Sequence, residues 1–210
     1  MLTDLLRRTG LVAILRGVGP ADVAEIGAAL FAAGFRIIEV PLGPPDALDS
    51  IRILRASVPA ECLVGAGTVV SSSQVDDVRQ AGGELIVMPH SDPMVIRAAK
   101  AAHLAVMPGV ATPTEAFAAL AAGADALKLF PAELLGPPIL KAWRVVLPAG
   151  TSLVPVGGIT PDKLAGFVAA GAAGAGLGTA LYRPGASASE VAARAASFVA
   201  AWRAAQGSPA

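Results

Sequence analysis

The sequence predicts an α/β fold of the (β/α)₈ TIM-barrel class, preceded by a short N-terminal helix. Three observations lead to this expectation: a length of 210 residues, a hydrophobic content of 54%, and short apolar segments that alternate with amphipathic stretches. A length of this order suits a single barrel domain of minimal size. We expect residues 1–210 to form one domain, because no linker, charge block or low-complexity segment divides them.

The expected strands are runs of Val, Ile and Leu that are mostly apolar, as is typical of strands buried on both faces. A helical stretch follows each run, so the pattern predicts repeated βαβ units with a parallel sheet. Eight such units favour a closed barrel over an open sheet. The runs span residues 11–17, 35–42, 63–69, 85–90, 105–111, 126–132, 152–159 and 174–178.

The helix boundaries carry capping signals. Residues 112–115 (TPTE) match a capping box with proline at the first helical position, and residues 71–74 and 187–190 fit the same box. The glycines that follow helical stretches are expected to adopt the left-handed conformation that ends a helix. These glycines are Gly34, Gly82, Gly123 and Gly171. We expect residues 205–210 to fray.

The charge balance excludes several classes of partner. Lys and Arg number 16, as do Asp and Glu, so no global field favours nucleic acid or an anionic membrane. The single cysteine, Cys62, excludes an internal disulfide framework, and we expect a cytoplasmic protein. No apolar run is long enough to span a bilayer without Gly, Pro or charge. Residues 1–10 are expected to form a capping helix and not a signal peptide.

Four polar residues interrupt the apolar runs. Arg16 ends the first run, Glu39 lies in the second, Thr68 ends the third, and Lys128 lies in the sixth. Because side chains alternate along a strand, Lys128 and Glu39 are expected to face the barrel interior while their neighbours face the helices. All four lie at or near the carboxyl ends of their strands, which is where barrels of this type place their chemistry.

The simplest alternative for Lys128 and Glu39 is a structural ion pair, since buried charges are usually paired. It leaves Arg16 and Thr68 at the same mouth unexplained, and desolvation often cancels the attraction within such a pair. Burial or a nearby cation frees a lysine amine to attack a ketone. The resulting iminium is an electron sink for the neighbouring C–C bond, and a carboxylate such as Glu39 can then shuttle protons.

Two glycine-rich segments follow the last expected strands. Residues 156–161 (VGGITP) open a helix, and residues 174–179 (GAGLGT) end the eighth strand. Glycines let the backbone approach an anion, and the loops after strands seven and eight are a frequent phosphate site in barrels. Ordinary turns explain either segment alone equally well. Together they favour a phosphate site, to which Thr179 could add a hydroxyl contact.

No metal site and no cofactor are expected. The histidines His90 and His103 are isolated, which makes a dedicated zinc site improbable. Two interpretations stay open for His90, at the end of the fourth strand: contact with a substrate hydroxyl, or a solvated capping role. Cys62 is expected to act as a small buried hydrophobe.

Five motifs occur together within residues 11–203: AILRG (13–17), EVPL (39–42), GAGTV (65–69), PGVATPTE (108–115) and LKLFPAE (127–133). In this combination the chain resembles the KDPG/KHG aldolase family, and within it the galactonate-type enzymes. The resemblance implies Lys128 as the Schiff-base lysine and Glu39 as the general acid/base. It implies Arg16 and Thr68 near the substrate carboxylate or carbonyl. The implied phosphate contacts are Gly157, Gly158, Gly176 and Gly178.

The resemblance further implies a homotrimer without a metal or cofactor. Its expected reaction is the reversible cleavage of a small phosphorylated keto acid, a 2-keto-3-deoxy-6-phosphosugar acid, to pyruvate and glyceraldehyde 3-phosphate. Residues 40–43 (VPLG) lack the arginine of gluconate-type enzymes and resemble the galactonate type. Residues 130–133 (FPAE) are also common in gluconate-type members, so the preferred configuration at C4 stays open.

Two other functions stay open. A phosphosugar isomerase or epimerase would share the phosphate loops, although metal-dependent epimerases need several histidine and carboxylate ligands that this sequence does not supply. A non-catalytic phosphometabolite sensor would need the loops but no nucleophilic lysine in a strand. Loss of activity with EDTA would favour the epimerase, and failure of borohydride to link pyruvate to Lys128 would favour the sensor.

Overall fold

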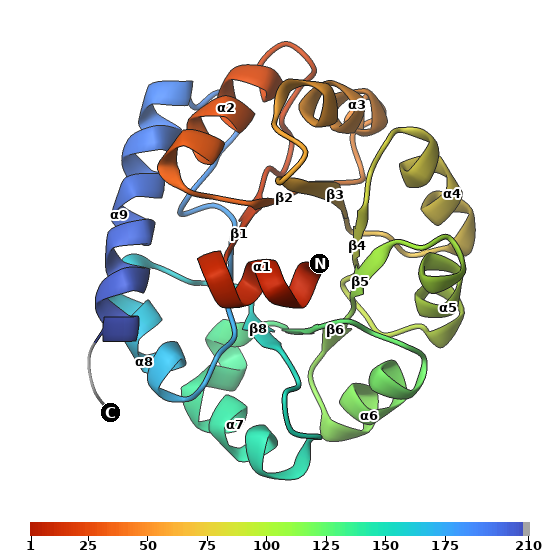
Figure 1. Cartoon of the computed structure of the whole chain (residues 1–210), viewed down its shortest axis with the longest axis vertical. Coiled ribbons are helices and arrows are strands. Elements are labelled where there is room, and N and C mark those ends of the chain that lie inside the picture. Colours follow the sequence, from red (N-terminus) through yellow and green to blue (C-terminus); the bar gives the residue numbers. More distant parts are fainter. Residues whose placement is uncertain (208–210) are drawn as a thin grey trace.

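Strands and helices alternate along residues 1–207, the part of the chain that the structure, a computed structural model, describes. The helices surround the strands as a ring, and α1 crosses the centre of that ring (Figure 1). The helices are α1 (Leu2–Thr9), α2 (Val23–Ala33), α3 (Ala47–Ser57), α4 (Ser72–Gln80), α5 (Pro93–Ala101), α6 (Pro113–Ala121), α7 (Ala132–Val146), the short 3₁₀ helix η1 (Pro161–Lys163), α8 (Leu164–Ala169) and α9 (Ala188–Gly207). The strands are β1 (Leu11–Ile14), β2 (Ile37–Pro41), β3 (Leu63–Gly67), β4 (Leu85–Val87), β5 (Ala105–Met107), β6 (Gly109–Val110), β7 (Leu127–Leu129), β8 (Leu153–Pro155) and β9 (Ala175–Leu177).

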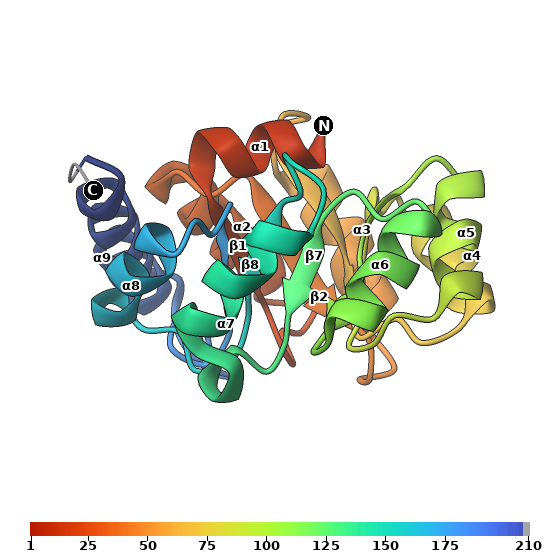
Figure 2. The same ribbon diagram turned by 90° about the horizontal axis from the view of Figure 1, so that it is seen from below.

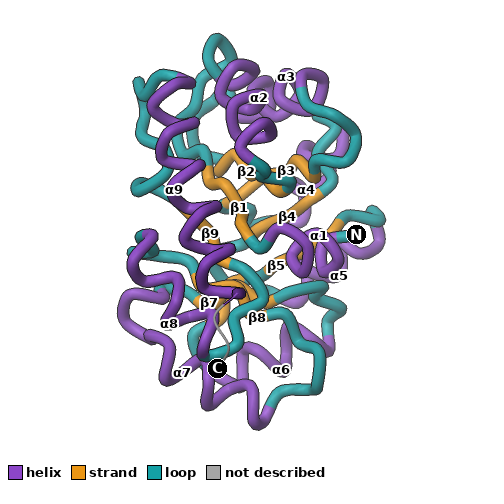
Figure 3. The backbone as a smooth tube through the Cα atoms, turned by 60° about the vertical axis from the view of Figure 1, so that its left-hand side comes forward, coloured by secondary structure: helices purple, strands orange, loops and turns teal. Residues whose placement is uncertain are grey.

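The strands pair in parallel and form two sheets. One sheet has six strands in the order β5-β4-β3-β2-β1-β9, and the other has three in the order β6-β7-β8. The last residues of β2 and β3, Pro41 and Gly67, are in register, and Ile14 at the end of β1 is in register with Glu39, so the carboxyl ends of these strands lie on the same side. In the smaller sheet Lys128 is in register with Val154. The strands lie inside the layer of helices (Figure 3).

The prediction of a closed eight-stranded TIM barrel is wrong, because the ladder of residues 1–207 is divided between these two sheets. One division falls at Pro108, inside the strand expected over 105–111. Met107 pairs with β4, whereas Gly109 pairs with β7. Proline has no N–H to donate, so a continuous ladder cannot run through this position.

The second division lies between β8 and β9. Only an isolated bridge, between Val156 and Gly176, connects the two segments. Pro155, the last residue of β8, also lacks an amide hydrogen, which removes one donor from the ladder. The fold is therefore an α/β arrangement of a curled six-stranded parallel sheet and a small three-stranded sheet.

Apolar side chains form one cluster on each side of the strands. The outer cluster contains Ile38, Val40, Leu127 and Leu129, as the alternation predicted. The inner cluster combines strand residues with side chains of α1 such as Leu6. Figure 2 shows α1 at one end of the molecule, so the prediction of a capping helix is confirmed. The carboxyl ends of the strands, which α1 does not cover, stay open for a functional site.

The predicted helix caps are confirmed. Thr112 and Glu115 form a reciprocal capping box at α6. Ser71 accepts a hydrogen bond from the N–H of Gln74, and Ser187 does the same from the N–H of Glu190. The glycines expected to be left-handed have positive φ angles: Gly34 at 110°, Gly82 at 84°, Gly123 at 104° and Gly171 at 92°.

The end of the chain differs from expectation. Fraying predicted for residues 205–207 is wrong, because α9 continues to Gly207, and residues 208–210 lie outside the described part. Buried Trp202 holds this helix, since a Cβ built on Gly10 would lie 2.1 Å from the indole. No helix within residues 1–207 combines the length and apolarity that crossing a bilayer requires.

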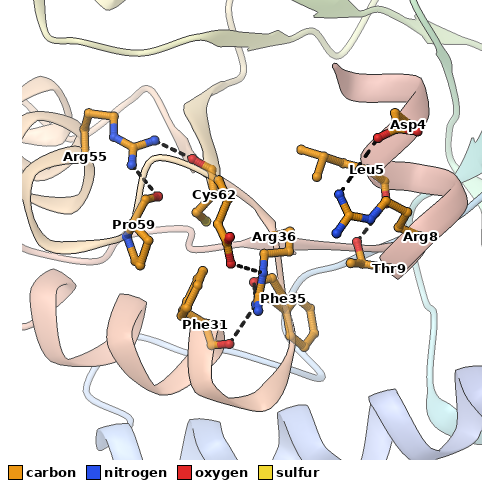
Figure 4. Close-up of polar contacts among 11 residues, drawn as sticks. Asp4, Leu5, Arg8, Thr9, Phe31, Phe35, Arg36, Arg55, Pro59 and Cys62 are labelled. Atoms are coloured by element: carbon orange, nitrogen blue, oxygen red, sulfur yellow. Dashed lines mark hydrogen bonds and ion pairs between the residues drawn. The ribbon is translucent and has the colours of Figure 1, made fainter.

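Two arginines near the amino ends of β2 and β3 are fully engaged (Figure 4). Arg36 donates to the carbonyl of Phe31 at 2.9 Å and pairs with Glu61 at 3.2 Å. Arg55 pairs with Glu84 at 3.0 Å and donates to neighbouring carbonyls. These cations join one strand–helix unit to the next and are not available to a ligand.

Candidate active site

A cavity of about 540 Å³ opens at the carboxyl ends of the strands. Its position follows from its lining, since Ile14 ends β1, Thr68 directly follows β3, and Val156 and Gly178 directly follow β8 and β9. Every site residue predicted from the sequence lines this one cavity: Arg16, Glu39, Thr68, Lys128, Gly157, Gly158, Gly176, Gly178 and Thr179.

Lys128 projects from the middle of β7 into the cavity. Its side chain is buried, and Nζ lies 4.7 Å from the ring centroid of Phe130. Burial is the main cause that lowers the pKa of Lys128; Glu39 opposes the shift and Arg16 adds to it. A lysine with a lowered pKa carries more of the uncharged amine at neutral pH, which is the nucleophilic form.

Glu39 projects from β2 into the same cavity and is only 2% exposed. Its Oε2 has no hydrogen-bond partner within residues 1–207. Burial raises the pKa of Glu39 to about 7, against the opposing effects of Lys128 and Arg16. Gly67 makes the room for this carboxyl, because a Cβ there would lie 1.4 Å from Oε2. Near neutral pH the group can therefore both accept and donate a proton.

The structural ion pair considered for Lys128 and Glu39 is absent. None of the ion pairs found in residues 1–207 joins these two side chains. Their charges influence each other's pKa without direct contact. An amine and a carboxyl group that face one cavity without binding each other leave room for a reacting molecule between them.

Arg16 and Thr68 stand at the mouth of the cavity. Arg16 follows β1 by two residues and is exposed. It is close enough to affect the pKa of both Lys128 and Glu39. Thr68 has a φ of 58°, which non-glycine residues rarely adopt. Such backbone strain clusters at functional sites.

The glycine-rich loops also line the cavity. Gly157 and Gly158 have φ angles of 112° and 63°, which favour glycine. A Cβ built on Gly178 meets no atom within 4 Å, so the backbone there is open to the cavity. Gly176 differs, since a Cβ would lie 2.6 Å from Val156 Cγ2. Gly176 is thus required for close packing between β8 and β9.

Among the further lining residues, three have side chains that can act on a ligand. Phe130 contacts the Lys128 amine. Glu133 lies in the first turn of α7 beside Gly158. Arg183 lies in the loop after β9. In the sequence, Arg183 could have been found as a cation shortly after the glycine-rich end of the eighth expected strand. Glu133 is marked only by its place in the LKLFPAE motif.

The remaining candidates lie outside the cavity. His90 is exposed and does not line it, although Pro89 does. His103 lines a separate depression together with Met1 of the amino end. Cys62 is a buried free thiol whose pKa burial raises to about 11, as expected of a small hydrophobe. Within residues 1–207 no three His, Cys, Asp or Glu side chains are grouped to hold a metal ion.

Comparison with known proteins assigns the chain to a family. The family model described as "KDPG and KHG aldolase" matches residues 2–195. The 2-dehydro-3-deoxy-6-phosphogalactonate aldolase of Escherichia coli (strain K12) is 46% identical over 193 residues, which cover 92% of this chain and 94% of that protein. The chain belongs to the KDPG and KHG aldolase family. It is therefore an aldolase, a carbon–carbon lyase.

Solved structures agree with this assignment. The "Native KDPGal structure" is 45% identical to this aldolase, with a TM-score of 0.91, and the match covers 93% of this chain and 95% of that one. The KDPG aldolase from Legionella pneumophila, with pyruvate captured at low pH as a covalent carbinolamine intermediate, is 25% identical. Its TM-score is 0.81, and 97% of each chain is covered. A carbinolamine is the adduct of an amine and a carbonyl group.

Proposed function

We propose that this aldolase cleaves 2-dehydro-3-deoxy-6-phosphogalactonate reversibly to pyruvate and D-glyceraldehyde 3-phosphate, through a Schiff base on Lys128. The observation that carries the proposal is a buried amine and a buried carboxyl group that share one cavity without pairing. The E. coli relative that bears this substrate's name is 46% identical over nearly the whole chain. The carbinolamine in the Legionella structure supports the covalent route.

In the proposed first step, the uncharged Lys128 amine adds to the C2 carbonyl of the substrate and gives a carbinolamine. The hydroxyl group of the carbinolamine then takes up a proton from solvent and leaves as water, which gives a protonated iminium. Burial, which lowers the pKa of Lys128, favours the amine needed for addition. The face of the Phe130 ring, 4.7 Å from Nζ, stabilises the cation that forms.

In the second step, Glu39 accepts the proton of the C4 hydroxyl, and the C3–C4 bond breaks. Its electron pair moves to the iminium, which becomes an enamine, and D-glyceraldehyde 3-phosphate leaves. Glu39 then returns its proton to C3, and hydrolysis of the new iminium releases pyruvate and restores the amine. A carboxyl group with a pKa of about 7 suits both directions of proton transfer at neutral pH.

The remaining cavity residues are proposed to hold the two ends of the substrate. Arg16 and Thr68 are assigned to the carboxylate and carbonyl end, because Arg16 acts electrostatically on both reacting groups. The segments with Gly157, Gly158, Gly176, Gly178 and Thr179 are assigned to the phosphate, because glycines without side chains let backbone N–H groups approach an anion, and the backbone at Gly178 is open.

The gluconate epimer is the second candidate substrate, since residues 130–133 (FPAE) also resemble gluconate-type enzymes. Pyruvate release from both phosphorylated C4 epimers, measured with lactate dehydrogenase and NADH, decides between them. We expect the higher kcat/KM with the galactonate epimer. A higher kcat/KM with the gluconate epimer would reverse the assignment, and no release from either would remove the proposed function.

We also propose that the enzyme is a cytoplasmic homotrimer. Exposed apolar side chains on α7, among them Leu134 and Val145 at 82% and 83% exposure, support an interface between copies. A lone buried cysteine suits a reducing compartment. Light scattering should give three times the chain mass of 20.9 kDa. A monomeric mass would contradict the trimer, and recovery outside the cytoplasmic fraction would contradict the location.

A further inference from the structure

Arg183 has no assigned role, yet it lines the active-site cavity beside the glycine-rich end. Its Nε donates to the carbonyl oxygen of Thr179 at 3.2 Å, which fixes the base of the guanidinium on the loop after β9. The next residue, Pro184, supports this loop from the neighbouring β1 side, because a Cβ built on Gly17 would lie 3.2 Å from Pro184 Cγ. The arginine is thus placed by its own loop and by a neighbour.

The other two nitrogens of the Arg183 guanidinium have no ion-pair or hydrogen-bond partner within residues 1–207. None of the ion pairs in residues 1–207 includes Arg183. Arg36 and Arg55, at the other end of the strands, pair with carboxylates and bind carbonyl groups (Figure 4). Arg183 by contrast lines the cavity, and its terminal N–H groups have no such partner within residues 1–207.

The cavity carries a second free arginine, Arg16, but the two differ in place. Arg16 acts on Lys128 and Glu39, the reacting end. Arg183 lies in the loop after β9 with Gly178 and Thr179, and β9 pairs with β1, the strand that precedes Arg16. The two cations therefore line the cavity from neighbouring loops, and Arg183 is the one that its own loop holds beside the glycines of β9.

The glycine loop has a feature that favours cations beside it, and one of them, Lys163, donates from Nζ to the carbonyl of Gly158 at 2.8 Å. The Glu133 carboxylate lies against this loop, since a Cβ built on Gly158 would lie 2.5 Å from Glu133 Oε2. A carboxylate at this position repels a phosphate group that approaches the loop. If backbone N–H groups at Gly157 and Gly158 bind phosphate, they do so against this repulsion, which the guanidinium of Arg183 in the same cavity would offset.

We propose that Arg183 binds the terminal phosphate of the substrate and makes the enzyme selective for phosphorylated over unphosphorylated sugar acids. A planar guanidinium offers paired N–H donors that match phosphate oxygens, and it stays charged throughout the working pH range. This inference rests on the proposed function, because it assigns one end of that substrate.

The test compares Arg183→Gln with Arg183→Lys and with Arg97→Gln. Arg97 is an exposed arginine on α5 that lies outside the cavity, so its variant matches the change in net charge. The readout is the ratio of kcat/KM on the phosphorylated substrate to kcat/KM on its unphosphorylated counterpart. We expect this ratio to fall about 10-fold to 100-fold in Arg183→Gln, the range for one lost charge-assisted contact. It should fall less in Arg183→Lys and stay unchanged in Arg97→Gln.

A structural role for Arg183 would give a different result. It would lower kcat/KM equally on both substrates, or lower the melting temperature of both Arg183 variants, and either outcome without a change in the ratio overturns the proposal. A ratio in Arg183→Gln within twofold of that in Arg97→Gln overturns it as well.

Calorimetric titration with inorganic phosphate separates this inference from the proposed function, because it needs no turnover. We expect Arg183→Gln to bind phosphate about tenfold more weakly than the wild type and Arg97→Gln, as for loss of one charge-assisted contact. Equal phosphate affinity in the three proteins would overturn the role of Arg183. An inactive wild type with this affinity difference intact would remove the proposed reaction and keep the phosphate site.

Discussion

The proposed reacting end of the cavity is built from side chains on strands, whereas the proposed phosphate end is built mainly from loops. Lys128 and Glu39 project from β7 and β2 and are 7% and 2% exposed. Gly157 and Gly158 offer backbone groups, and Arg183, which lines the same cavity, is exposed. Burial changes the pKa of a side chain, and rigid strands hold it in place, so this construction suits chemistry. Exposed loops suit recognition of a ligand.

The comparison predicts that changes at the two ends differ in kind. Variants at the reacting end should lower kcat, because they remove interactions made in the transition state. Variants at the phosphate end should raise KM for phosphorylated substrates and leave the capture of pyruvate intact. The following predictions run from the largest expected effect to the smallest.

Lys128→Ala should lower turnover by about 10⁴-fold or more, because no other amine in the cavity can replace the Schiff base. The measurement is pyruvate release, with circular dichroism to show that the fold persists. Lys141→Ala, on the exposed face of α7, is the matched control and should retain full activity. A folded Lys128→Ala enzyme with a near-normal rate would contradict the assignment of the chemistry to the strand residues.

Glu39→Gln should slow turnover by about 10²-fold to 10⁴-fold, the usual range for one acid–base group. Gln keeps the shape of the side chain and removes its proton exchange, so the fold is expected to survive. Steady-state kinetics of cleavage give the effect, which should appear in kcat. An unchanged kcat with a raised KM would assign Glu39 to binding and not to proton transfer.

The pH profile should show a limb set by Glu39. Cleavage needs the carboxylate form, and burial raises the pKa of Glu39 to about 7. The rate of cleavage should therefore fall by about tenfold per pH unit below pH 7, and protonation of Lys128 acts in the same direction. Activity measured between pH 5 and pH 8 checks this. A flat profile over that range would contradict a proton-accepting role for Glu39.

Gly158→Ala should raise KM for the phosphorylated substrate by about tenfold. Alanine at a φ of 63° costs about 1–2 kcal/mol, and its Cβ would press on the Glu133 carboxylate at 2.5 Å. Gly150 has a φ of 84° and open space around it, so Gly150→Ala is a control for backbone strain alone. If both substitutions had equal kinetic effects, the effect at Gly158 would come from backbone strain, and a role of Gly158 in phosphate binding would be contradicted.

Glu133→Gln should have the smallest effect and the opposite sign. Removing a carboxylate beside Gly158 relieves repulsion of the phosphate, but Glu133 is exposed and screened by solvent. KM for the phosphorylated substrate should fall by up to about fivefold at low salt, and less at high salt. A higher KM would show that Glu133 supports the loop more than it repels the ligand.

The two ends also differ in how far the sequence predicts them. A lysine between Leu127 and Leu129, or a glutamate between Ile38 and Val40, stands out because strand side chains alternate. The alternation also predicted the outer cluster, and capping motifs predicted where several helices begin and end. Local rules of this kind suffice for side chains that belong to regular elements.

The parts that were wrong or missed depend on contacts distant in sequence. The division of the ladder at Pro108 depends on which strand each neighbouring residue pairs with, and β4 and β7 are far apart in the chain. Arg183 and Glu133 reach the cavity from a loop and a helix start, where no periodicity marks the direction of a side chain. Trp202 anchors the last helix through a contact with Gly10 at the other end of the sequence.

The most direct test of the central claim is reduction of the enzyme with sodium borohydride in the presence of pyruvate, followed by peptide mass mapping. An uncharged amine at Lys128 should form an iminium that reduction fixes, so the mass of a reduced pyruvate adduct should appear on the peptide that contains Lys128. The adduct should be absent from Lys128→Ala. A stable adduct on another lysine, or none at all in the active enzyme, would contradict the account.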